Sequence, residues 1–322
     1  MRTGSSFMGI ATALAVLLFT GAAQAQAART WVSSSLGGDG NPCTRALPCI
    51  TFADAYAQTA AGGEIDVLDP GDYGSLLIQH AITIANDGVG TVAVTATIPF
   101  FIYAGSADAV ILRGLEIESS DGLNSGVIFL SGGSLIVDHC NIHGFAGPAG
   151  IWFEPATVAK LWVTDSTLWA NGSNPAGNIV IQPVLSGSAT VLLERVRILQ
   201  AIGNGVRADE TLVNPGSGAM NVTLHDVVVD GSSSSGIVAV SAPSGGLAVN
   251  VMLDHVTVSN NVGFGIRAVG ATATVRLSRS TVVNNTTGLG TSDGGALASY
   301  ADNFFSGNAD GDGAPTGAIA PK

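Results

Sequence analysis

The sequence predicts an all-β solenoid whose coils stack through parallel strands. Seven segments between about Val110 and Val283 align in one register, at intervals of about 24 to 31 residues. Apolar and polar residues alternate within each segment, which is typical of strands with one face turned inward. A single coil of this length cannot bury a face alone, so the coils must stack on one another. The equivalent inward positions are Leu112, Val137, Val163, Leu193, Leu224, Leu253 and Leu277.

The first 25 residues have the anatomy of a secretory signal peptide. Arg2 precedes an apolar stretch from about Met8 to Phe19, and Ala23-Gln24-Ala25 follows. The apolar run is too short for a confident membrane span, and no stop-transfer segment comes after it. We therefore expect a secreted or periplasmic protein that begins near Gln26 and has no membrane span after cleavage.

Cys43 and Cys49 lie close together between Pro42 and Pro48. In an oxidising compartment this spacing predicts a disulfide that closes a tight loop. The alternative, a zinc site, is incomplete with two thiols and no adjacent histidine. Cys140 aligns with an apolar column, so we interpret it as a buried free thiol.

A short helix is predicted at the start of the solenoid. An open end of parallel strands exposes an unpaired edge, so we expect a cap over residues 29–63. Thr51-Phe52-Ala53-Asp54 resembles a capping box, and Gly62-Gly63 is expected to end the helix. The residues that share one face of this helix are Phe52, Ala55, Tyr56 and Thr59.

The repeats continue from early coils to an acidic tail. Residues 64–68, 76–78 and 81–84 supply early strands. In the repeats a second strand begins with Gly or Asn followed by a β-branched residue, as in Gly236-Ile237, because a permissive backbone is needed at the corner. The solenoid domain is expected over residues 26–305, and residues 306–322, rich in Gly, Ala and Asp, predict a flexible acidic tail.

The charge excludes several classes of partner. Of 12 Lys and Arg, removal of Arg2 leaves 11 against 24 Asp and Glu, so the mature chain carries about −13. Nucleic acids and anionic membranes require clustered basic residues and are not expected partners. The same charge opposes direct binding of polyuronates unless a cation or an arginine cluster intervenes.

The amino-terminal motifs carry a resemblance to a known family. Cys43-x5-Cys49, Thr51-Phe52-Ala53, Gly62-Gly63-Glu64-Ile65 and Leu68-Asp69-Pro70-Gly71 resemble the signature of a group of secreted bacterial β-helix proteins in the pectin-lyase-like superfamily. The resemblance covers nearly the whole mature chain and implies a single-stranded right-handed parallel β-helix. The superfamily includes polysaccharide lyases, hydrolases, epimerases and non-catalytic members, so the resemblance leaves the function open.

Two Asp-His pairs invite a catalytic interpretation. Asp138-His139 and Asp254-His255 resemble the Asp-His pair of pectate lyases. However, the residues that align with these pairs in successive coils have opposite charges, or form pairs of hydrogen-bond donors and acceptors. A turn ladder of hydrogen bonds and ion pairs explains these residues without catalysis.

The best catalytic candidates are Arg207 and Arg267, with Asp209 and Glu210 close to Arg207. The two arginines occupy one outward column two coils apart. A lyase needs a base and a cation that stabilises an enolate, and arginine with Ca²⁺ held by carboxylates supplies both. The Asp cluster expected of a Ca²⁺-dependent lyase is missing from this column, so no catalytic set is recognisable. The alternative interpretation is an arginine on a solvated face.

Aromatic side chains suggest a carbohydrate surface. Trp162 and Trp169 lie at outward positions of one coil, Trp152 shares the column of Arg207, and His143 aligns with Trp169. Aromatic rings on a flat β-face stack against the apolar faces of sugars. The alternative is a long loop that covers the stripe. The column of Trp162 continues with Ile136, Leu192 and Met252.

One weak metal motif lies near the end of the chain. Asn308, Asp310 and Asp312 match the first half of a calcium loop, but Ile319 stands where the bidentate acid is needed. Ca²⁺ is thus the only cofactor that the sequence suggests, and a tail without metal is the alternative.

Together these features predict a secreted β-helix that binds a polysaccharide or a cell-surface glycan without a recognisable catalytic set. Two alternatives stay open: a polysaccharide lyase or glycoside hydrolase with a divergent site, and a structural or adhesive surface protein.

Overall fold

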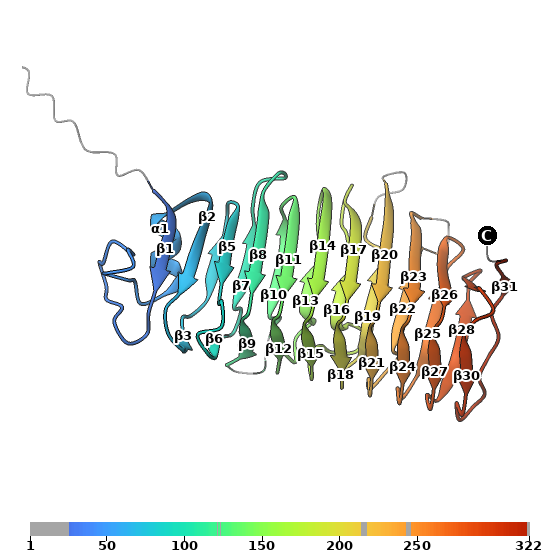
Figure 1. Cartoon of the computed structure of the whole chain (residues 1–322). Coiled ribbons are helices and arrows are strands. Elements are labelled where there is room, and N and C mark those ends of the chain that lie inside the picture. The colour runs from blue at the N-terminus through green and yellow to red at the C-terminus, as the bar shows by residue number, and fades with distance from the viewer. Residues whose placement is uncertain (1–25, 121, 123, 214–217, 243–245, 321–322) are drawn as a thin grey trace, which may run out of the picture.

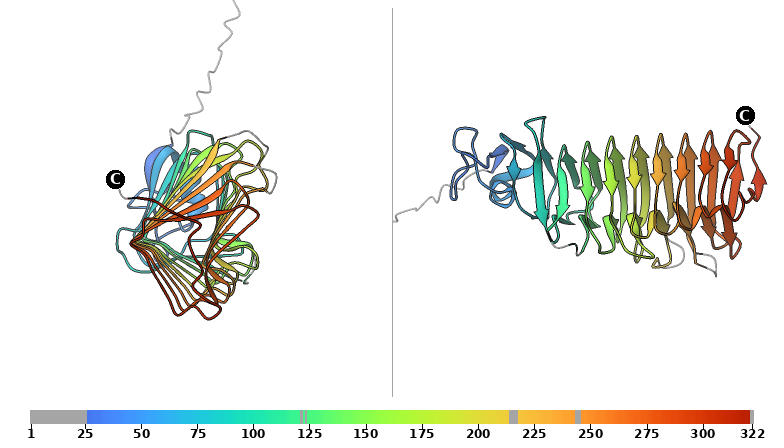
Figure 2. Two further views of the ribbon diagram at one scale, coloured as in Figure 1. Left: turned by 90° about the vertical axis from the view of Figure 1, so that its right-hand side faces the viewer. Right: turned by 90° about the horizontal axis from the view of Figure 1, so that it is seen from below.

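The computed structural model describes residues 26–120, 122, 124–213, 218–242 and 246–320. These residues form an elongated parallel β-solenoid in which three sheets run along the length of the molecule (Figure 1). In the end view of Figure 2 the coils lie over one another. The predicted signal peptide, residues 1–25, lies outside the described residues. Among the described residues, no helix is long and apolar enough to cross a membrane.

Each full coil contributes one strand to each of the three sheets, which we call A, B and C. Sheet A contains β1 (Ala27–Val32), β2 (Thr59–Val67), β5 (Ile82–Ala85), β8 (Ala109–Arg113), β11 (Ser134–Asp138), β14 (Val158–Thr164), β17 (Ser188–Glu194), β20 (Ala219–His225), β23 (Ala248–Asp254), β26 (Ala273–Ser278), β29 (Ala296–Ser299) and β31 (Gly317–Ala318).

Sheet B contains β3 (Gly71–Asp72), β6 (Val92–Ala96), β9 (Glu116–Ser119), β12 (Asn141–His143), β15 (Thr167–Trp169), β18 (Arg197–Leu199), β21 (Val228–Asp230), β24 (Thr257–Ser259), β27 (Thr281–Val283) and β30 (Phe304–Ser306). Sheet C contains β4 (Leu76–Ile78), β7 (Phe100–Tyr103), β10 (Val127–Ser131), β13 (Ala149–Phe153), β16 (Gly177–Ile181), β19 (Asn204–Asp209), β22 (Ile237–Val240), β25 (Phe264–Val269) and β28 (Thr287–Ser292).

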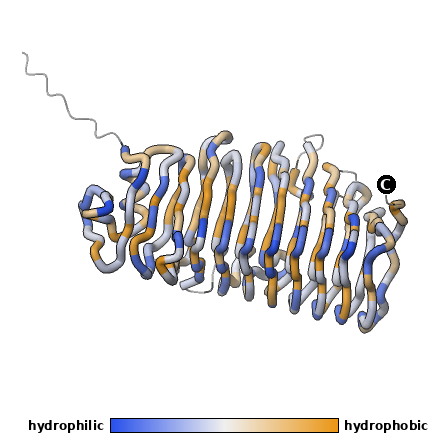
Figure 3. Tube along the Cα trace, in the orientation of Figure 1, coloured by the Kyte–Doolittle hydropathy of each residue, from blue (hydrophilic) through white to orange (hydrophobic). Residues whose placement is uncertain are grey.

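The predicted register of the repeats is confirmed. From β8 to β26, the seven aligned aliphatic positions pair with one another in neighbouring coils of sheet A. All seven side chains are buried. Figure 3 shows the alternation of hydrophobic and hydrophilic residues along the coils that produces this interior column.

The coils have one more strand than the two that the sequence predicts. From β8 to β29, the segment after each sheet A strand turns at one residue with a left-handed backbone, such as Asp165 (φ 49°), Arg195 (φ 53°) and His255 (φ 55°). One residue of this conformation is enough to redirect the chain into a separate short strand of sheet B. At this bend the alternation is interrupted, because two consecutive residues, such as Thr164 and Asp165, lie between the buried residues Val163 and Ser166. The interruption does not by itself show that the next strand belongs to another sheet.

The amino-terminal helix is α1 (Phe52–Gln58), and it ends earlier than predicted. Thr51 Oγ1 accepts the backbone N–H of Asp54 at 3.1 Å, as expected of a helix N-cap. The chain leaves the helix at Thr59, whose hydroxyl donates to Ala55 O at 2.7 Å. Gly62-Gly63, expected to end the helix, lies within β2 because this segment pairs with β1 and β5.

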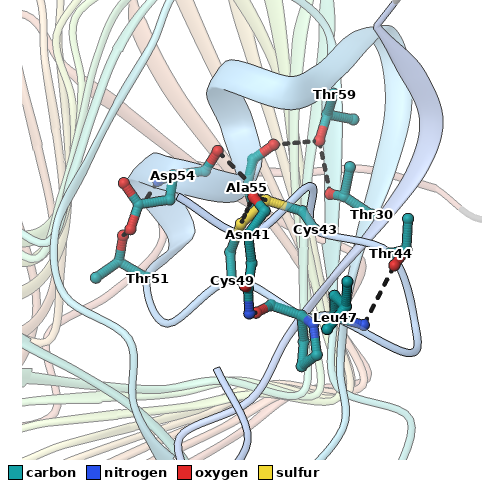
Figure 4. Close-up of a disulfide and its surroundings, with 11 residues drawn as sticks. Thr30, Asn41, Cys43, Thr44, Leu47, Cys49, Thr51, Asp54, Ala55 and Thr59 are labelled. Atoms are coloured by element: carbon teal, nitrogen blue, oxygen red, sulfur yellow. Dashed lines mark hydrogen bonds between the residues drawn. A yellow bond between two sulfur atoms is a disulfide. The ribbon is translucent and has the colours of Figure 1, made fainter. Parts of the chain in front are cut away.

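The Cys43–Cys49 disulfide is confirmed and lies beside α1 (Figure 4). Its loop runs along the outer edge of β1: Trp31 N donates to Cys43 O, and Cys49 N donates to Trp31 O. The loop thus satisfies backbone groups that the first strand of sheet A would otherwise expose. Cys140 is free and buried, and burial raises the pKa of its thiol to about 12.

Asparagine side chains form a ladder inside the turn that follows sheet B. The backbone N–H and Nδ2 of Asn261 donate to Asn285 Oδ1 at 3.1 and 2.7 Å. Asn285 donates in the same way to Asn308 Oδ1 at 2.9 and 3.0 Å. All three side chains are buried. The ladder therefore joins successive coils through side chains as well as through strands.

The predicted flexible tail is wrong for residues 306–320, which fold against the last coils. β31 pairs with β29, and Thr316 N donates to Leu297 O at 2.7 Å while Leu297 N donates to Thr316 Oγ1 at 2.9 Å. The edge of β29 offers unpaired backbone groups, so even a Gly- and Ala-rich segment is held there by main-chain hydrogen bonds. Composition alone does not reveal this pairing.

Asp69 organises the turn beneath the first coil. Its carboxylate accepts hydrogen bonds from Ser33 Oγ (2.7 Å), Ser34 N (2.7 Å), Ser35 N (3.2 Å) and the Tyr73 hydroxyl (2.7 Å). Burial opposes the charged form, but these hydrogen bonds outweigh it and hold the pKa of Asp69 well below its usual value.

We expect Asp69 to make stability depend on pH. Because its pKa is lowered on folding, its contribution is complete above the unfolded value of about 3.9 and is lost as the pH falls below it. Asp69→Asn should lower the Tm at pH 7, and its difference from the wild type should shrink towards pH 2. Thermal unfolding at pH 7, 4 and 2.5 measures this, with Asp39→Asn, an exposed aspartate nearby, as the control. A difference that stays constant with pH would contradict the assignment.

Candidate functional site

The three tryptophans of one coil lie on three different sheets. Trp152 belongs to β13 in sheet C, Trp162 to β14 in sheet A, and Trp169 to β15 in sheet B. Asp165, with its left-handed backbone, turns the chain between the last two. The structure therefore offers no single aromatic platform that contains all three rings.

His143 and Trp169 stack on sheet B, as their alignment predicts. Their ring centroids are 4.4 Å apart with an interplanar angle of 14°. Trp169 Nε1 donates to Asn141 Oδ1 at 3.1 Å, and His143 Nε2 lies 2.6 Å from Glu116 Oε1. Both rings are thus engaged by neighbouring side chains, although 37 % of Trp169 remains exposed.

Trp152 lies on a part of sheet C whose outward side chains are covered. Its neighbours in the column, Ile128 and Val180, are buried. The indole Nε1 is also buried, and it has no hydrogen-bond partner among the described residues. Trp152 is therefore poorly placed to stack on a sugar in solution.

The catalytic candidates are held in separate structural contacts. Arg207 Nε and Nη2 donate to Asp209 Oδ2 at 2.9 and 2.6 Å, and the other oxygen of Asp209 accepts from Thr211 N and Oγ1 at 2.9 and 2.6 Å. Arg267 lies 5.0 Å from the ring centroid of Phe264. Val238 separates the two arginines in the column, as predicted.

Glu210 is a buried anchor for the next loop. It accepts the backbone N–H groups of Ala242 at 2.5 Å and Leu247 at 3.2 Å. Only 1 % of the residue is exposed. Its carboxylate therefore serves the backbone, and it does not face Arg207 as a free base.

The weak calcium candidates also have structural roles. Asn308 Nδ2 and N donate to Asp312 Oδ1 at 2.7 and 3.2 Å, so Asp312 ends the asparagine ladder. Asp310 N donates to Thr286 O at 2.7 Å. Asn308 and Asp312 are thus used to close the last coil, whereas Asp310 contributes its backbone N–H to the hydrogen bonds of this segment.

The turn between sheets A and B carries the charged ladder that the alignment predicts. Arg195 donates to both carboxylate oxygens of Asp165 at 2.7 Å. Arg279 donates to Asp254 at 2.5 to 3.0 Å. Partial burial opposes ionisation of Asp254, but the bonds from Arg279 hold the pKa of its carboxyl below the usual value.

A groove of about 440 Å³ lies on the outward face of sheet A. Its floor is the column of Leu192, Thr223 and Met252, and Trp162 pairs in register with Leu192 at one end of this column. The groove thus continues the apolar stripe predicted from the sequence. Along the side next to the turn, it is lined by Glu194, His225, Asp254, Ser278 and Arg279, and Tyr300 lies at its far end.

The sequence pattern indicates Asp254 as part of an Asp-His pair, but it indicates neither the groove that Asp254 lines nor Tyr300. The signal was available, because the charged residues follow the inward aliphatic position of each repeat. Their common alignment indicates a ladder of ion pairs, and the adjoining column of Trp162 indicates an aromatic surface, but neither pattern shows that the two line one groove. Tyr300 lies beyond the aligned repeats, so no column connected it with the others.

A second cavity, of about 510 Å³, lies where sheet C leads into the loops towards sheet A. Tyr103, Leu130, Glu154 and Val184 are among its lining residues. Burial raises the pKa of the Glu154 carboxyl. Glu154 is the only carboxylate that lines this cavity among the described residues, so the pair of acids that glycoside hydrolysis ordinarily uses is not assembled here.

Comparison with solved structures gives three matches at low sequence identity. The crystal structure of pectate lyase Pel9A matches with a TM-score of 0.53 and 14 % identity over 84 % of this chain and 67 % of that one. A GH136 lacto-N-biosidase from Eubacterium ramulus matches with a TM-score of 0.47 and 10 % identity over 91 % and 67 %. A rhamnogalacturonan lyase matches with a TM-score of 0.41 and 12 % identity over 84 % and 73 %.

No family model matches the chain, and no curated protein does so either. The likeness to the pectate lyase shows the fold alone: this protein is a right-handed parallel β-solenoid. At this level of identity the likeness does not extend to an activity.

Proposed function

We propose that this protein is a secreted carbohydrate-binding β-helix that holds a polysaccharide or a cell-surface glycan in the groove on sheet A. The observation that carries the proposal is the pairing of a floor that contains the apolar side chains of Leu192 and Met252 with a row of hydrogen-bonding side chains along one side. Sugar rings present apolar C–H faces and polar hydroxyls at their edges, and a binding site must satisfy both. Secretion is supported by the amino-terminal sequence and by the Cys43–Cys49 disulfide.

The solenoid repeat suits a ligand that is itself a repeating chain. Neighbouring strands lie about 4.8 Å apart, so a glycan along the axis meets an equivalent side chain at each coil. The groove runs from β17, which carries Leu192, past β20, β23 and β26 to the residue after β29. A fold neighbour that is a pectate lyase is consistent with a polysaccharide ligand.

The charges along the groove favour a glycan without high charge density. Glu194 and Asp254 contribute carboxylates, while Arg279 contributes a cation that is paired with Asp254. Together with the acidic net charge of the chain, this arrangement opposes a polyuronate. The carboxylates nearest Arg207 in sequence are held in structural hydrogen bonds, so we propose binding and assign no reaction.

Trp162→Ala is expected to weaken glycan binding about fivefold, because one aromatic contact with a sugar contributes about 1 kcal/mol. Trp169→Ala is the matched control: it removes the same side chain from the same coil, but on sheet B. A glycan array followed by calorimetry with the best ligand measures both, and thermal unfolding checks the fold. Equal affinity of wild type and Trp162→Ala, or a loss confined to Trp169→Ala, would exclude the groove on sheet A.

We further infer that α1 and the disulfide loop act together as the amino-terminal cap. α1 packs against β1 and β2, and the loop occupies the outer edge of β1. Such covering prevents edge-to-edge association of solenoids.

A further inference from the structure

Two imidazoles and a carboxylate converge at the turn beside the groove. His225 is the last residue of β20, Asp226 follows it, and His255 follows β23 in the next coil. One ligand atom from each lies within 4.8 Å of the other two. The exposed fractions of the three side chains are 40 %, 50 % and 48 %, so a cation from solution can reach them.

The backbone holds two of these residues in equivalent positions. Asp226 and His255 both have left-handed backbones, with φ of 52° and 55°, at corresponding places of adjacent coils. Asp226 N donates to Asp254 O at 3.2 Å, and His255 N donates to Ser278 O at 3.3 Å. Their side chains therefore leave the turn in the same direction, one strand spacing of about 4.8 Å apart.

Asp254 orients the imidazole ring of His225 through a hydrogen bond. Its Oδ2 lies 3.1 Å from Nδ1 of His225, and a carboxylate can only accept, so Nδ1 carries the proton. The neutral ring then presents the lone pair of Nε2, which lies 3.5 Å from Asp226 Oδ2. A histidine that donates one ring N–H to a carboxylate and offers the other nitrogen is the usual form of a metal-binding imidazole.

We propose that His225, Asp226 and His255 bind one divalent transition metal ion of the zinc class. Two imidazole nitrogens and one carboxylate oxygen suit Zn²⁺ and its neighbours, whereas Ca²⁺ and Mg²⁺ require oxygen ligands. Asp254 acts as a positioning residue, because its carboxylate is already paired with Arg279. The remaining coordination positions are open to water. This site does not depend on carbohydrate binding, although His225 also lines the groove.

The same turn column contains an internal comparison. Asp138, His139 and Asp165 also gather within 4.8 Å. That cluster has one imidazole in place of two, and both oxygens of Asp165 accept from Arg195 at 2.7 Å. It should therefore bind a transition metal much more weakly than the His225 cluster.

The test is calorimetric titration of residues 26–322 with Zn²⁺, after removal of any affinity tag and treatment with a chelator. We expect one Zn²⁺ per chain and no Ca²⁺ binding at the same concentrations. His225→Gln and His255→Gln should each weaken Zn²⁺ at least tenfold, while His139→Gln should leave the affinity unchanged. Thermal unfolding without metal confirms that each variant folds, which we expect because the altered side chains are half exposed.

Electron paramagnetic resonance with Cu²⁺ adds a readout of the ligands themselves. The wild type should show coupling to two imidazole nitrogens, and His255→Gln to one. Asp254→Asn should weaken the affinity about tenfold or more but retain the two-nitrogen spectrum, as expected for a positioning residue. The proposal is overturned by the absence of saturable Zn²⁺ binding, by variants of His225 and His255 that bind like the wild type, or by an equal loss in His139→Gln.

Discussion

Asn285→Ala is expected to lower the free energy of unfolding by about 4 kcal/mol, because several buried polar groups lose their partners at once. Asn285 Oδ1 accepts from Asn261 N and Nδ2, and its own Nδ2 donates to Val258 O and Val283 O at 3.1 and 3.0 Å. Each buried polar group that loses its partner costs about 1 to 3 kcal/mol. Water cannot replace the lost partner as easily as it does at the surface, because the turn is packed between two coils.

Asn250→Ala is the matched control for this experiment. Asn250 also bonds an asparagine of the neighbouring coil, with Nδ2 donating to Asn221 Oδ1 at 3.2 Å, but this bond is exposed to solvent. Its loss should change stability by about 0.5 kcal/mol or less. Chemical denaturation of both variants decides the matter, and a cost below about 1 kcal/mol for Asn285→Ala would show that the ladder contributes little.

Gly236→Ala is expected to destabilise the solenoid by about 3 kcal/mol, because an added methyl group has no space between the coils. A Cβ at Gly236 would stand 2.5 Å from Val258 Cγ1, 2.7 Å from Gly265 O and 2.9 Å from Asn261 Nδ2. Asn261 Nδ2 cannot move without breaking its hydrogen bond to Asn285 Oδ1 in the next coil. Gly265 O is a backbone atom of β25, so its movement would disturb the pairing of β25 with β22.

Gly317→Ala provides the comparison at a glycine with open space around it. Gly317 lies in β31, and a Cβ built there meets no atom within 4 Å. We expect its effect to stay within about 0.5 kcal/mol. Urea unfolding of the two variants separates the crowding at Gly236 from a general preference for glycine. Equal stabilities of the two variants would refute the crowding.

The repeat pattern predicted the inward residues correctly because the interior of a solenoid imposes the same requirement on every coil. Leu112, Val137 and Val163 are buried and in register, as aligned. His143 and Trp169 were placed side by side from the same alignment, and they stack. The Cys43–Cys49 disulfide followed from the short spacing together with the oxidising compartment that the amino-terminal sequence predicts.

The errors arose where local pattern and long-range pairing compete. Gly62-Gly63 has the composition of a helix end, yet it lies in β2, where Gly63 pairs with Ile82 of β5 and the flanking residues of β2 pair with β1. Residues after Ser306 have the composition of a loose tail, yet β31 pairs with β29. In both segments the partner strand is distant in the sequence, and composition carries no record of it.

The order of the residues is enough to predict which residues face the interior and which are neighbours along the axis. Both properties depend on the repeat period and on the alternation of apolar and polar residues. Which outward residues share a face, in contrast, depends on how the chain turns in space. A single left-handed residue, Asp165, sends Trp162 and Trp169 to different sheets. The stacking of five coils brings Leu192, His225 and Tyr300 to one groove, because the direction of each turn in space, and not the pattern of polarity, sets the faces of a solenoid.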